Sequence, residues 1–271
     1  MIEFIEIDET DKVIKALEAN LFSFFTNFGR TRFGEINESS NLLYFSTGTG
    51  SLFHNGVFRA RLQVEEVEGA IAKVIEYFAA KQAPFCWWTT NSTQPAELGK
   101  YLEAQGLKYL SEFPGMAIDL SNLPRRRCPK DLEIIRVEDR TALESWLRIG
   151  AIGFDIPVEL VEYLLPLEES LGFQSDRYTR YLALWQKTPV AISALYLDAG
   201  VAGIYFVATL PEARGKGFAS CLVQTALEDA QKLGYQVAIL QASAMGKNVY
   251  QRIGFQECCP IEIYFWQPPE Q

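Results

Sequence analysis

The sequence predicts an α/β protein made of two similar halves in tandem. Its 271 residues suit one large domain or two of ordinary size. Segments with helical spacing of apolar residues alternate along the chain with short β-branched and aromatic runs that are typical of strands. The order strand, helix, glycine also occurs twice, at Cys86–Gly106 and again at Ala238–Gly254. This repetition predicts two copies of one fold, and the alternative is a single larger α/β domain without a true repeat.

In the N-terminal half, apolar stripes indicate helices, and short apolar runs between turn residues indicate strands. The expected strands are Phe4–Ile7, Leu42–Ser46, Gly56–Leu62, Pro84–Thr90 and Met116–Leu120. The expected helices run from Asp8–Asp11 to Gly29, from Glu65 to Lys81, and from Pro95 to Gln105.

The same patterns continue in the C-terminal half. The expected strands are Leu132–Val137, Tyr181–Gln186, Val190–Leu197, Ile204–Thr209 and Val237–Leu240. The expected helices are Arg140–Ile149, Pro157–Leu167, a segment from 219 to 233, and a short one after Ser243. Lys187–Pro189 reads as a turn that joins two of these strands in a hairpin.

The loop between the strand that ends at Thr209 and the following helix is the most informative stretch. It reads Arg214-Gly215-Lys216-Gly217-Phe218-Ala219. Unpaired N–H groups at the start of a helix attract phosphate oxygens. Gly215 and Gly217 allow the backbone to approach a ligand closely, and Arg214 and Lys216 add positive charge. The loop is therefore predicted to bind an anion.

Two common phosphate-binding loops do not fit this stretch. A P-loop requires the pattern GxxxxGK[ST], which does not occur in the chain. A dinucleotide-binding fingerprint requires glycine or alanine at its sixth position and an acidic residue about 20 residues later. Here the sixth position is Ser220 and the later region reads Gly234–Gln236, which contains no acid.

A third type of loop fits. Arg214, Gly217 and Ala219 form an Arg-x-x-Gly-x-Ala pattern that resembles the (Gln/Arg)-x-x-Gly-x-(Gly/Ala) loop of the GNAT superfamily, the acetyl-CoA-dependent N-acetyltransferases. The preceding Val207–Pro211 is similar to that family's fourth strand, and Tyr250–Phe255 is similar to its Tyr-x-x-x-Gly-Phe ending. The resemblance implies, for each half, a mixed and mostly antiparallel twisted sheet flanked by helices.

The resemblance also implies the residues that contact the cofactor. Backbone N–H groups of the loop would bind the diphosphate of acetyl-CoA, and the strand before it would pair with the pantetheine arm. Ser243 stands where family members often have an asparagine that contacts the cofactor. The implied cofactor-binding residues are Val207, Ala208, Thr209, Arg214, Gly215, Lys216, Gly217, Phe218, Ala219, Ser220 and Ser243.

The implied reaction is direct transfer of an acetyl group to an amine of a small molecule or peptide, with CoA as the product. Tyr250 is the implied catalytic acid that protonates the departing thiolate, and the alternative is a tyrosine that only packs on the sheet. The general base is unassigned: a carboxylate, Tyr196, Tyr205 or an ordered water chain are the options. His54, the chain's only histidine, is expected to be structural, or else to reach the acceptor cleft.

The N-terminal half lacks both features of the site. Its corresponding helix begins at Val64-Glu65-Glu66, which is acidic where phosphate would bind, and Leu102 occupies the position of Tyr250. The expected division is a degenerate GNAT-like domain without a cofactor loop at 1–123, a linker at 124–130, and a catalytic domain at 131–271. The linker contains Arg125, Arg126 and Arg127, which are expected to be solvated or, in the alternative, to bind the 3′-phosphate of CoA.

Composition narrows the function further. The net charge of −9 argues against nucleic acid as a partner. No apolar run reaches membrane-spanning length, and the acidic N-terminus shows no signal-peptide pattern. The five cysteines include no Cys-x-x-Cys pair, and with one histidine they do not suggest a metal site. They are expected to be free thiols in a cytoplasmic protein, whose oligomeric state the sequence does not indicate.

Three functions compete. The first is an N-acetyltransferase, an acyltransferase that transfers groups other than aminoacyl. The second is a CoA- or acyl-CoA-binding sensor or scaffold without turnover. The third is transfer of an aminoacyl group from tRNA, which suits a tandem layout but is disfavoured by the acidity of the chain.

Overall fold

The structure, a computed structural model, describes residues 5–124 and 127–269. It divides the chain into two compact units, Met1–Leu21 with Gly115–Cys258, and Phe22–Pro114 with Cys259–Gln271. We call them the cofactor unit and the N-terminal unit. Helix α1 (Thr10–Gly29) contributes to both. Among the described residues, every helix is too short or too polar to cross a bilayer.

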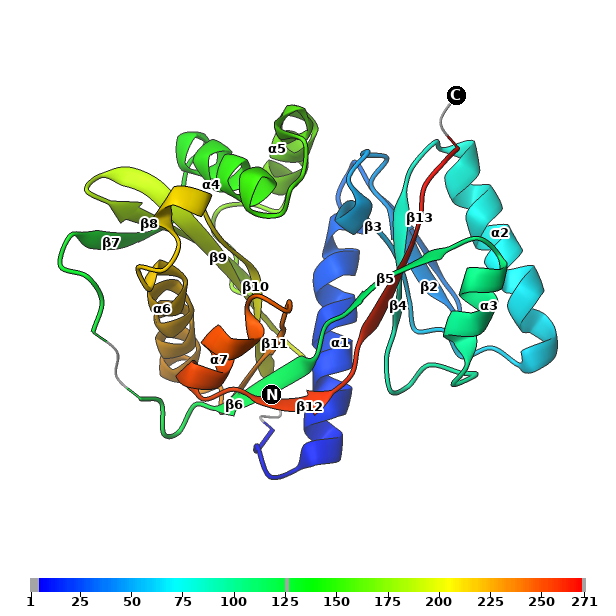
Figure 1. Cartoon of the computed structure of the whole chain (residues 1–271), viewed down its shortest axis with the longest axis horizontal. Coiled ribbons are helices and arrows are strands. Elements are labelled where there is room, and N and C mark those ends of the chain that lie inside the picture. Colours follow the sequence, from blue (N-terminus) through cyan, green and yellow to red (C-terminus); the bar gives the residue numbers. More distant parts are fainter. Residues whose placement is uncertain (1–4, 125–126, 270–271) are drawn as a thin grey trace. The chain divides into compact units, whose positions relative to one another are not determined.

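The cofactor unit contains a seven-stranded sheet with helices packed on it (Figure 1). Its strands are β6 (Gly115–Asp119), β7 (Leu132–Arg136), β8 (Tyr178–Trp185), β9 (Thr188–Asp198), β10 (Val201–Thr209), β11 (Val237–Gln241) and β12 (Gln256–Cys259). Its helices are α4 (Arg140–Gly153), α5 (Val161–Ser170), α6 (Phe218–Lys232) and α7 (Lys247–Ile253), with 3₁₀ turns at Val158–Leu160 and Pro211–Ala213. The strand order is β12-β6-β11-β10-β9-β8-β7. The β10–β11 pair is parallel, and the β11–β6, β10–β9, β9–β8 and β8–β7 pairs are antiparallel.

The N-terminal unit repeats this plan with six strands in the order β1-β2-β3-β4-β13-β5. The strands are β1 (Glu35–Glu38), β2 (Leu43–Ser46), β3 (Asn55–Phe58), β4 (Phe85–Thr89), β5 (Lys108–Glu112) and β13 (Glu262–Trp266). The helices are α2 (Val67–Ala80) and α3 (Leu98–Ala104), with 3₁₀ turns at Leu52–His54 and Val64–Glu66. The parallel pair is β3–β4, which matches β10–β11 in the cofactor unit. Two mixed, mostly antiparallel sheets flanked by helices confirm the predicted fold class.

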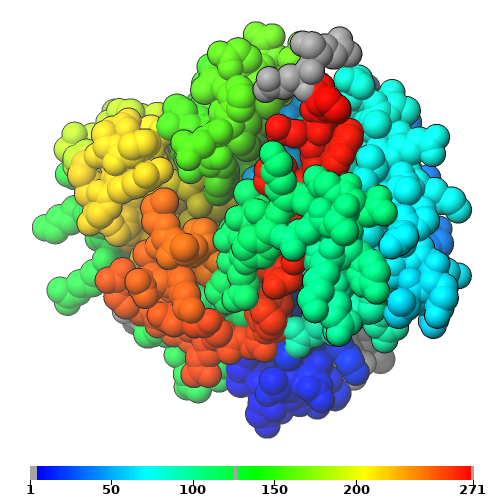
Figure 2. Space-filling model, turned by 45° about the vertical axis from the view of Figure 1, so that its right-hand side comes forward, coloured from blue at the N-terminus to red at the C-terminus, as the bar shows by residue number. Residues whose placement is uncertain are grey.

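The units do not follow the predicted boundaries at residues 123 and 131, because the halves exchange strands. β6 lies in the first half of the sequence but pairs with β11 in the cofactor unit. β13 ends the chain but pairs with β4 and β5 in the N-terminal unit. Figure 2 shows the red C-terminal segment among the cyan and green residues of the N-terminal half. Apolar alternation identifies a strand but does not tell which sheet it joins, so the sequence could not reveal this exchange.

The first part of α1 is fixed to the cofactor unit by a buried amide. Asn20 Nδ2 donates to the backbone carbonyls of Tyr196, Asp198 and Val201 at 3.3, 3.0 and 3.3 Å. These carbonyls lie at the turn between β9 and β10, so the helix satisfies acceptors that the turn leaves unpaired. The strand predicted before this helix is not found at Ile5–Ile7, and Phe4 lies outside the described residues.

Each unit has its own apolar core. In the cofactor unit, the apolar face of α6 (Phe218, Leu222 and Leu227) packs on the sheet. In the N-terminal unit, Ile71 and Phe78 of α2 pack with Trp87 and other residues of its sheet. The spacing that predicted both helices is therefore the spacing of their buried faces.

A disulfide corrects the expectation of five free thiols. Cys128, in the connector before β7, is bonded to Cys221 in the first turn of α6. Their Cα atoms are 5.9 Å apart, within the range that a disulfide requires. Cys86, Cys258 and Cys259 are not disulfide-bonded. The pairing follows from the connector's path past α6, which no cysteine spacing encodes. Arg125 and Arg126 of the connector lie outside the described residues.

Reduction of this disulfide is expected to destabilise the protein. The bond links residues 93 positions apart, and closing so long a loop restricts the unfolded chain, typically by about 2–4 kcal/mol. Urea unfolding with and without dithiothreitol measures the loss. Cys128→Ser should unfold at the lower concentration under both conditions, whereas Cys258→Ser should keep the response to reductant. A wild-type midpoint that ignores reductant contradicts the prediction.

His54 is buried within the N-terminal unit. Its Nδ1 lies 2.8 Å from Ser51 Oγ, and its ring packs edge-on against Phe28 at a centroid distance of 5.0 Å. Burial lowers the pKa of His54 from 6.5 to about 4. This environment supports the structural role that the sequence favours for the residue.

The lowered pKa of His54 predicts an acid-dependent loss of stability. The unfolded chain binds a proton near pH 6.5 and the folded protein only near pH 4, so stability is complete above pH 6.5 and falls between these values, by about 3 kcal/mol in all. Urea unfolding between pH 7.5 and 4 should show a smaller loss in His54→Gln. Because His54 is the only histidine, a ¹H NMR titration also measures its pKa directly, and a value near 6.5 contradicts the prediction.

Candidate functional site

The candidate site begins where β10 and β11 separate. The two strands pair only at Ala202 with Ala238 and at Gly203 with Ile239. Beyond Gly203, the edge of β10 that faces β11 has no strand partner among the described residues. An extended ligand can bind such an edge as an added strand. The predicted pantetheine-binding residues Val207, Ala208 and Thr209 lie on this open part of β10.

A β-bulge interrupts the same part of β10. The register with β9 shifts between Tyr205 and Ala208, and Phe206 has φ +50°. A bulge re-aims side chains and leaves backbone groups outside the ladder. The N–H groups in this bulge are therefore candidates to hydrogen-bond a ligand carbonyl.

The loop from Arg214 to Ser220 has the geometry of an anion site. Gly215 and Gly217 have φ +78° and +82°, a region that favours glycine, and a Cβ on either would meet no atom within 4 Å. Gly217 is the N-cap of α6, and no side chain caps this end. The N–H groups of residues 215–220 have no hydrogen-bond acceptor among the described residues. Residues 214–217 are exposed, so these donors are open to solvent.

Both cations of the loop are held close to it. Arg214 Nε donates to the Thr209 carbonyl at 3.2 Å. Lys216 Nζ lies 4.1 Å from the centroid of the Trp185 ring and donates to the Glu212 carbonyl at 3.4 Å. A cation over an indole face is attracted by the ring's quadrupole. The two charges therefore lie beside the unpaired amides.

Tyr250 lies on α7, which packs against α6. Its ring is buried, 6.0 Å from that of Phe255, and its hydroxyl has no hydrogen-bond partner among the described residues. Burial raises the pKa of Tyr250 above its usual value. A phenol in this state keeps its proton at neutral pH and can donate it. Ser243 is exposed, and its Oγ accepts a hydrogen bond from the Gly246 N–H at 3.2 Å.

The candidate bases named from the sequence fare differently. Tyr205 is buried and donates its hydroxyl proton to Asn20 Oδ1 at 2.7 Å, and burial raises its pKa well above the usual value. A hydroxyl that is engaged in this way is a poor base, so the structure argues against Tyr205. Tyr196 is buried on β9, opposite Gly203. His54 belongs to the N-terminal unit.

Three aromatic residues near the site have no role in the sequence interpretation. Phe206 lies in the bulge of β10, Trp185 lies under Lys216, and Phe154 follows the last residue of α4. A bulge leaves no mark in a run of apolar residues, and no motif contains the other two. The exposure of Phe154, 39%, is the only property that distinguishes it, and it requires the structure.

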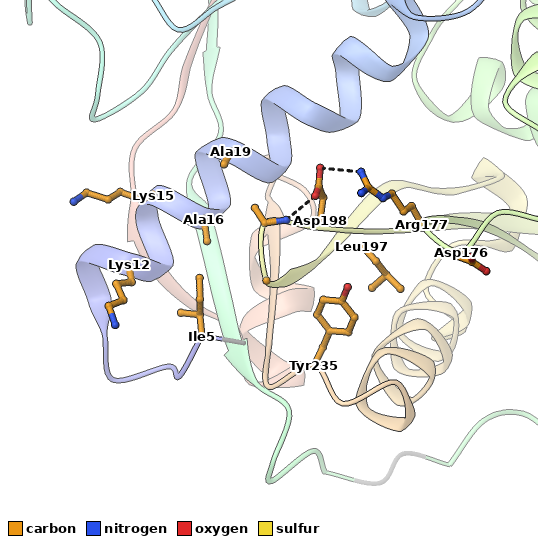
Figure 3. A pocket seen from close by; sticks show the side chains of 12 residues that line it. Ile5, Lys12, Lys15, Ala16, Ala19, Asp176, Arg177, Leu197, Asp198 and Tyr235 are labelled. Atoms are coloured by element: carbon orange, nitrogen blue, oxygen red, sulfur yellow. Dashed lines mark hydrogen bonds and ion pairs between the residues drawn. The ribbon is translucent and has the colours of Figure 1, made fainter. Parts of the chain in front are cut away.

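A separate cavity of about 770 Å³ lies by the turn before β10, at the opposite end of this strand from the loop. Its lining residues are Ile5, Lys12, Lys15, Ala16, Ala19, Asp176, Arg177, Leu197, Asp198, Ala199, Gly200 and Tyr235. Figure 3 shows Arg177 pointing toward Asp198, and their charged groups are 3.8 Å apart. The cavity contains none of the predicted site residues.

Comparisons with known proteins agree with this fold. Residues 146–255 match the family model of the acetyltransferase (GNAT) family. No curated protein matches the chain. The structure is similar to a GCN5-related N-acetyltransferase from Kribbella flavida, with a TM-score of 0.72 and 17% identity over 94% of this chain and 96% of the other.

Two further solved structures show the same arrangement. A GCN5-related N-acetyltransferase from Sphaerobacter thermophilus has a TM-score of 0.61 and 15% identity over 86% of this chain and 82% of the other. A tandem GNAT protein from the clavulanic acid biosynthesis pathway has a TM-score of 0.55 and 9% identity over 97% and 96%. At these identities the likeness shows the fold. The family match and the repeated fold together place the chain in the GNAT superfamily, with two GNAT folds in tandem.

Proposed function

We propose that the protein transfers an acetyl group from acetyl-CoA to an amine of a small molecule or peptide, at a single site in the cofactor unit. The observation that carries the proposal is the row of unpaired N–H groups at residues 215–220, beside the open edge of β10. Together they offer donors for a diphosphate and a backbone edge for an extended arm. Bound acetyl-CoA supplies an activated acyl thioester.

The residues have distinct roles in this proposal. Residues 215–220 bind the diphosphate, with Arg214 and Lys216 as neighbouring charges, and Val207–Thr209 bind the pantetheine arm. An N–H in the bulge of β10 donates to the acyl oxygen as charge develops on it. The site thereby orients the acyl carbon for attack by the amine nitrogen, and this orientation supplies much of the rate. Ser243 remains a contact at the edge of the site.

Proton transfer completes the reaction. As the carbon–sulfur bond breaks, Tyr250 donates its proton to the departing sulfur, and the amine loses its proton to water. Because the structure argues against Tyr205, we propose an ordered water chain as the base. The N-terminal unit has no equivalent site: acidic residues, Glu65 and Glu66, precede α2, and Leu102 is buried in α3.

The alternative is a CoA sensor without turnover, because the same loop would serve binding alone. Calorimetric titration with acetyl-CoA tests the loop, and thiol release from acetyl-CoA tests transfer, with a panel of alkyl monoamines, aryl-alkyl monoamines, polyamines, aminoglycosides and amino acids. We expect binding and release of CoA with at least one class. Binding without release across the whole panel identifies a sensor.

Tyr250→Phe is expected to lower kcat by about 100-fold, the usual contribution of a positioned acid, and to leave the Kd of acetyl-CoA within about twofold. Because burial raises the pKa of Tyr250, its protonation should not limit the wild-type rate between pH 7 and 9. Steady-state kinetics and calorimetry measure both quantities, with the exposed Tyr163→Phe as the control. An unchanged kcat in Tyr250→Phe assigns the tyrosine to packing.

A further inference from the structure

Three aromatic rings form a continuous surface beside the candidate site. We call Trp146, Phe154 and Phe206 the aromatic wall. The centroid of the Phe206 ring lies 5.6 Å from that of Trp146 and 6.3 Å from that of Phe154, with interplanar angles of 82° and 60°. Trp146 is buried, and its Nε1 donates to the Ser193 carbonyl at 3.2 Å. Trp146 is thus the fixed end of the wall, while Phe154 is 39% exposed and faces solvent.

The bulge places Phe206 in this wall. Alternate residues of a strand share a face, so Phe206 should face the α6 core, as Ile204 does. The register shift between Tyr205 and Ala208 changes this phase: Val207 packs against that core, and Phe206 packs against α4. The bulky Phe206 adopts φ +50°, a conformation that L-residues disfavour. An unfavourable backbone at a bulge is a reason to look for a function of the side chain that it re-aims.

The wall borders the place where the acyl group is proposed to lie. A Cβ on Gly153 would lie 2.6 Å from Ala208 Cβ and 3.9 Å from the Thr209 nitrogen. The end of α4 therefore contacts the segment of β10 that we assign to the pantetheine arm. Phe154 is the next residue, so its exposed ring is directly beside this segment.

The charges around the wall favour an acceptor with a single cationic group. Glu144, Glu168 and Glu169 are paired with Arg148, Arg180 and Arg140, respectively. Asp155, next to Phe154, is exposed and has no ion-pair partner among the described residues. One carboxylate beside an aromatic surface matches an ammonium attached to an apolar ring, and it does not match a polycation.

We propose that the aromatic wall binds an aromatic group of the acyl acceptor, so that the preferred acceptors are aryl-alkyl monoamines. This proposal rests on the acetyl transfer proposed above. Ring-to-ring contact stabilises a bound aromatic group through burial and through the preferred edge-to-face geometry. The bond formed is the amide between the acceptor nitrogen and the acetyl carbon, the carbon–sulfur bond breaks, and CoA leaves as the thiol.

The test compares 2-phenylethylamine, n-butylamine and spermidine as acceptors, with kcat/KM measured by thiol release from acetyl-CoA. We expect 2-phenylethylamine to exceed both other amines by at least about 10-fold, the amount expected for burial of a further apolar group. Phe154→Ala should remove most of this preference and leave the Kd of acetyl-CoA unchanged. Phe206→Leu should do the same and also raise KM. Tyr163→Ala, which removes an equally exposed ring from α5, should change nothing.

Each other outcome overturns the proposal. Equal or better turnover of spermidine, or a preference that survives Phe154→Ala, removes the wall from acceptor binding while acetyl transfer stands. A preference for phenylacetyl-CoA over acetyl-CoA that Phe154→Ala abolishes assigns the wall to the acyl group. Acetyl-CoA binding without thiol release for every amine defeats the proposed transfer and, with it, this proposal.

Discussion

Gly217→Glu is expected to abolish measurable binding of acetyl-CoA, with a loss of at least about 100-fold in affinity, or about 2.7 kcal/mol. Gly217 is the uncapped N-cap of α6 and lies within the row of unpaired N–H groups. A glutamate there places a carboxylate where the proposed diphosphate binds, so it both repels the ligand and can cap the helix itself. Isothermal titration calorimetry measures the affinity, and far-UV circular dichroism confirms the fold.

Gly172→Glu is the matched control for this loss. Gly172 lies in the same unit, has φ +80°, and would also accommodate a Cβ with no atom within 4 Å. Both substitutions impose the same backbone strain and the same added charge, and only one of them touches the loop. Affinity should stay within about twofold of wild type in Gly172→Glu. Retained binding in a folded Gly217→Glu protein would falsify the assignment of the loop.

Arg180→Met is expected to destabilise the cofactor unit by about 3–5 kcal/mol, the usual effect of leaving one charge of a buried pair alone. Both side chains of the Arg180–Glu168 pair are 1% exposed, with the charged atoms 2.6 Å apart. Arg180 also donates to the carbonyls of Glu168 at 2.8 Å and Gly172 at 2.9 Å. Its loss therefore leaves a buried carboxylate and two acceptors without a donor. Calorimetry should show a Tm drop on the order of 10 °C.

Two further variants separate this effect from a general loss of arginine. Arg148→Met breaks the exposed pair with Glu144, whose side chains are 54% and 44% exposed, and should cost less than about 1 kcal/mol. The double variant Glu168→Leu/Arg180→Met leaves no buried charge and should recover part of the stability lost in Arg180→Met. Equal Tm values for Arg180→Met and Arg148→Met contradict the buried-pair explanation.

The local elements could be read from the sequence because their signals are local. The stripe of α6, the glycine that ends α1, and the loop with Gly215 and Gly217 each depend on residues within a few positions of one another. The structure finds these elements at the expected residues and leaves the loop amides unpaired. The family resemblance rests on the same stretch and agrees with the match at 146–255.

Other features depend on chain segments that meet only after folding. Short strands such as β1 and β13 carry too weak a pattern to be recognised alone, and the exchange of β6 and β13 depends on hydrogen bonds between distant segments. The Cys128–Cys221 bond and the buried Arg180–Glu168 pair depend on side chains that the fold brings together. None of these pairings has a fixed spacing in the chain.

The sequence by itself determined the two-copy α/β plan, the half that contains a phosphate-binding loop, and Tyr250 as the candidate acid. Only the tertiary structure decided which sheet each exchanged strand joins, the bonding of Cys128 to Cys221, the unsuitability of Tyr205 as a base, and the turn of Phe206 toward α4. The physical reason is range. Helix stripes, glycine turns and helix caps are set by neighbours in sequence, whereas strand register, buried hydrogen bonds and burial itself are set by neighbours in space.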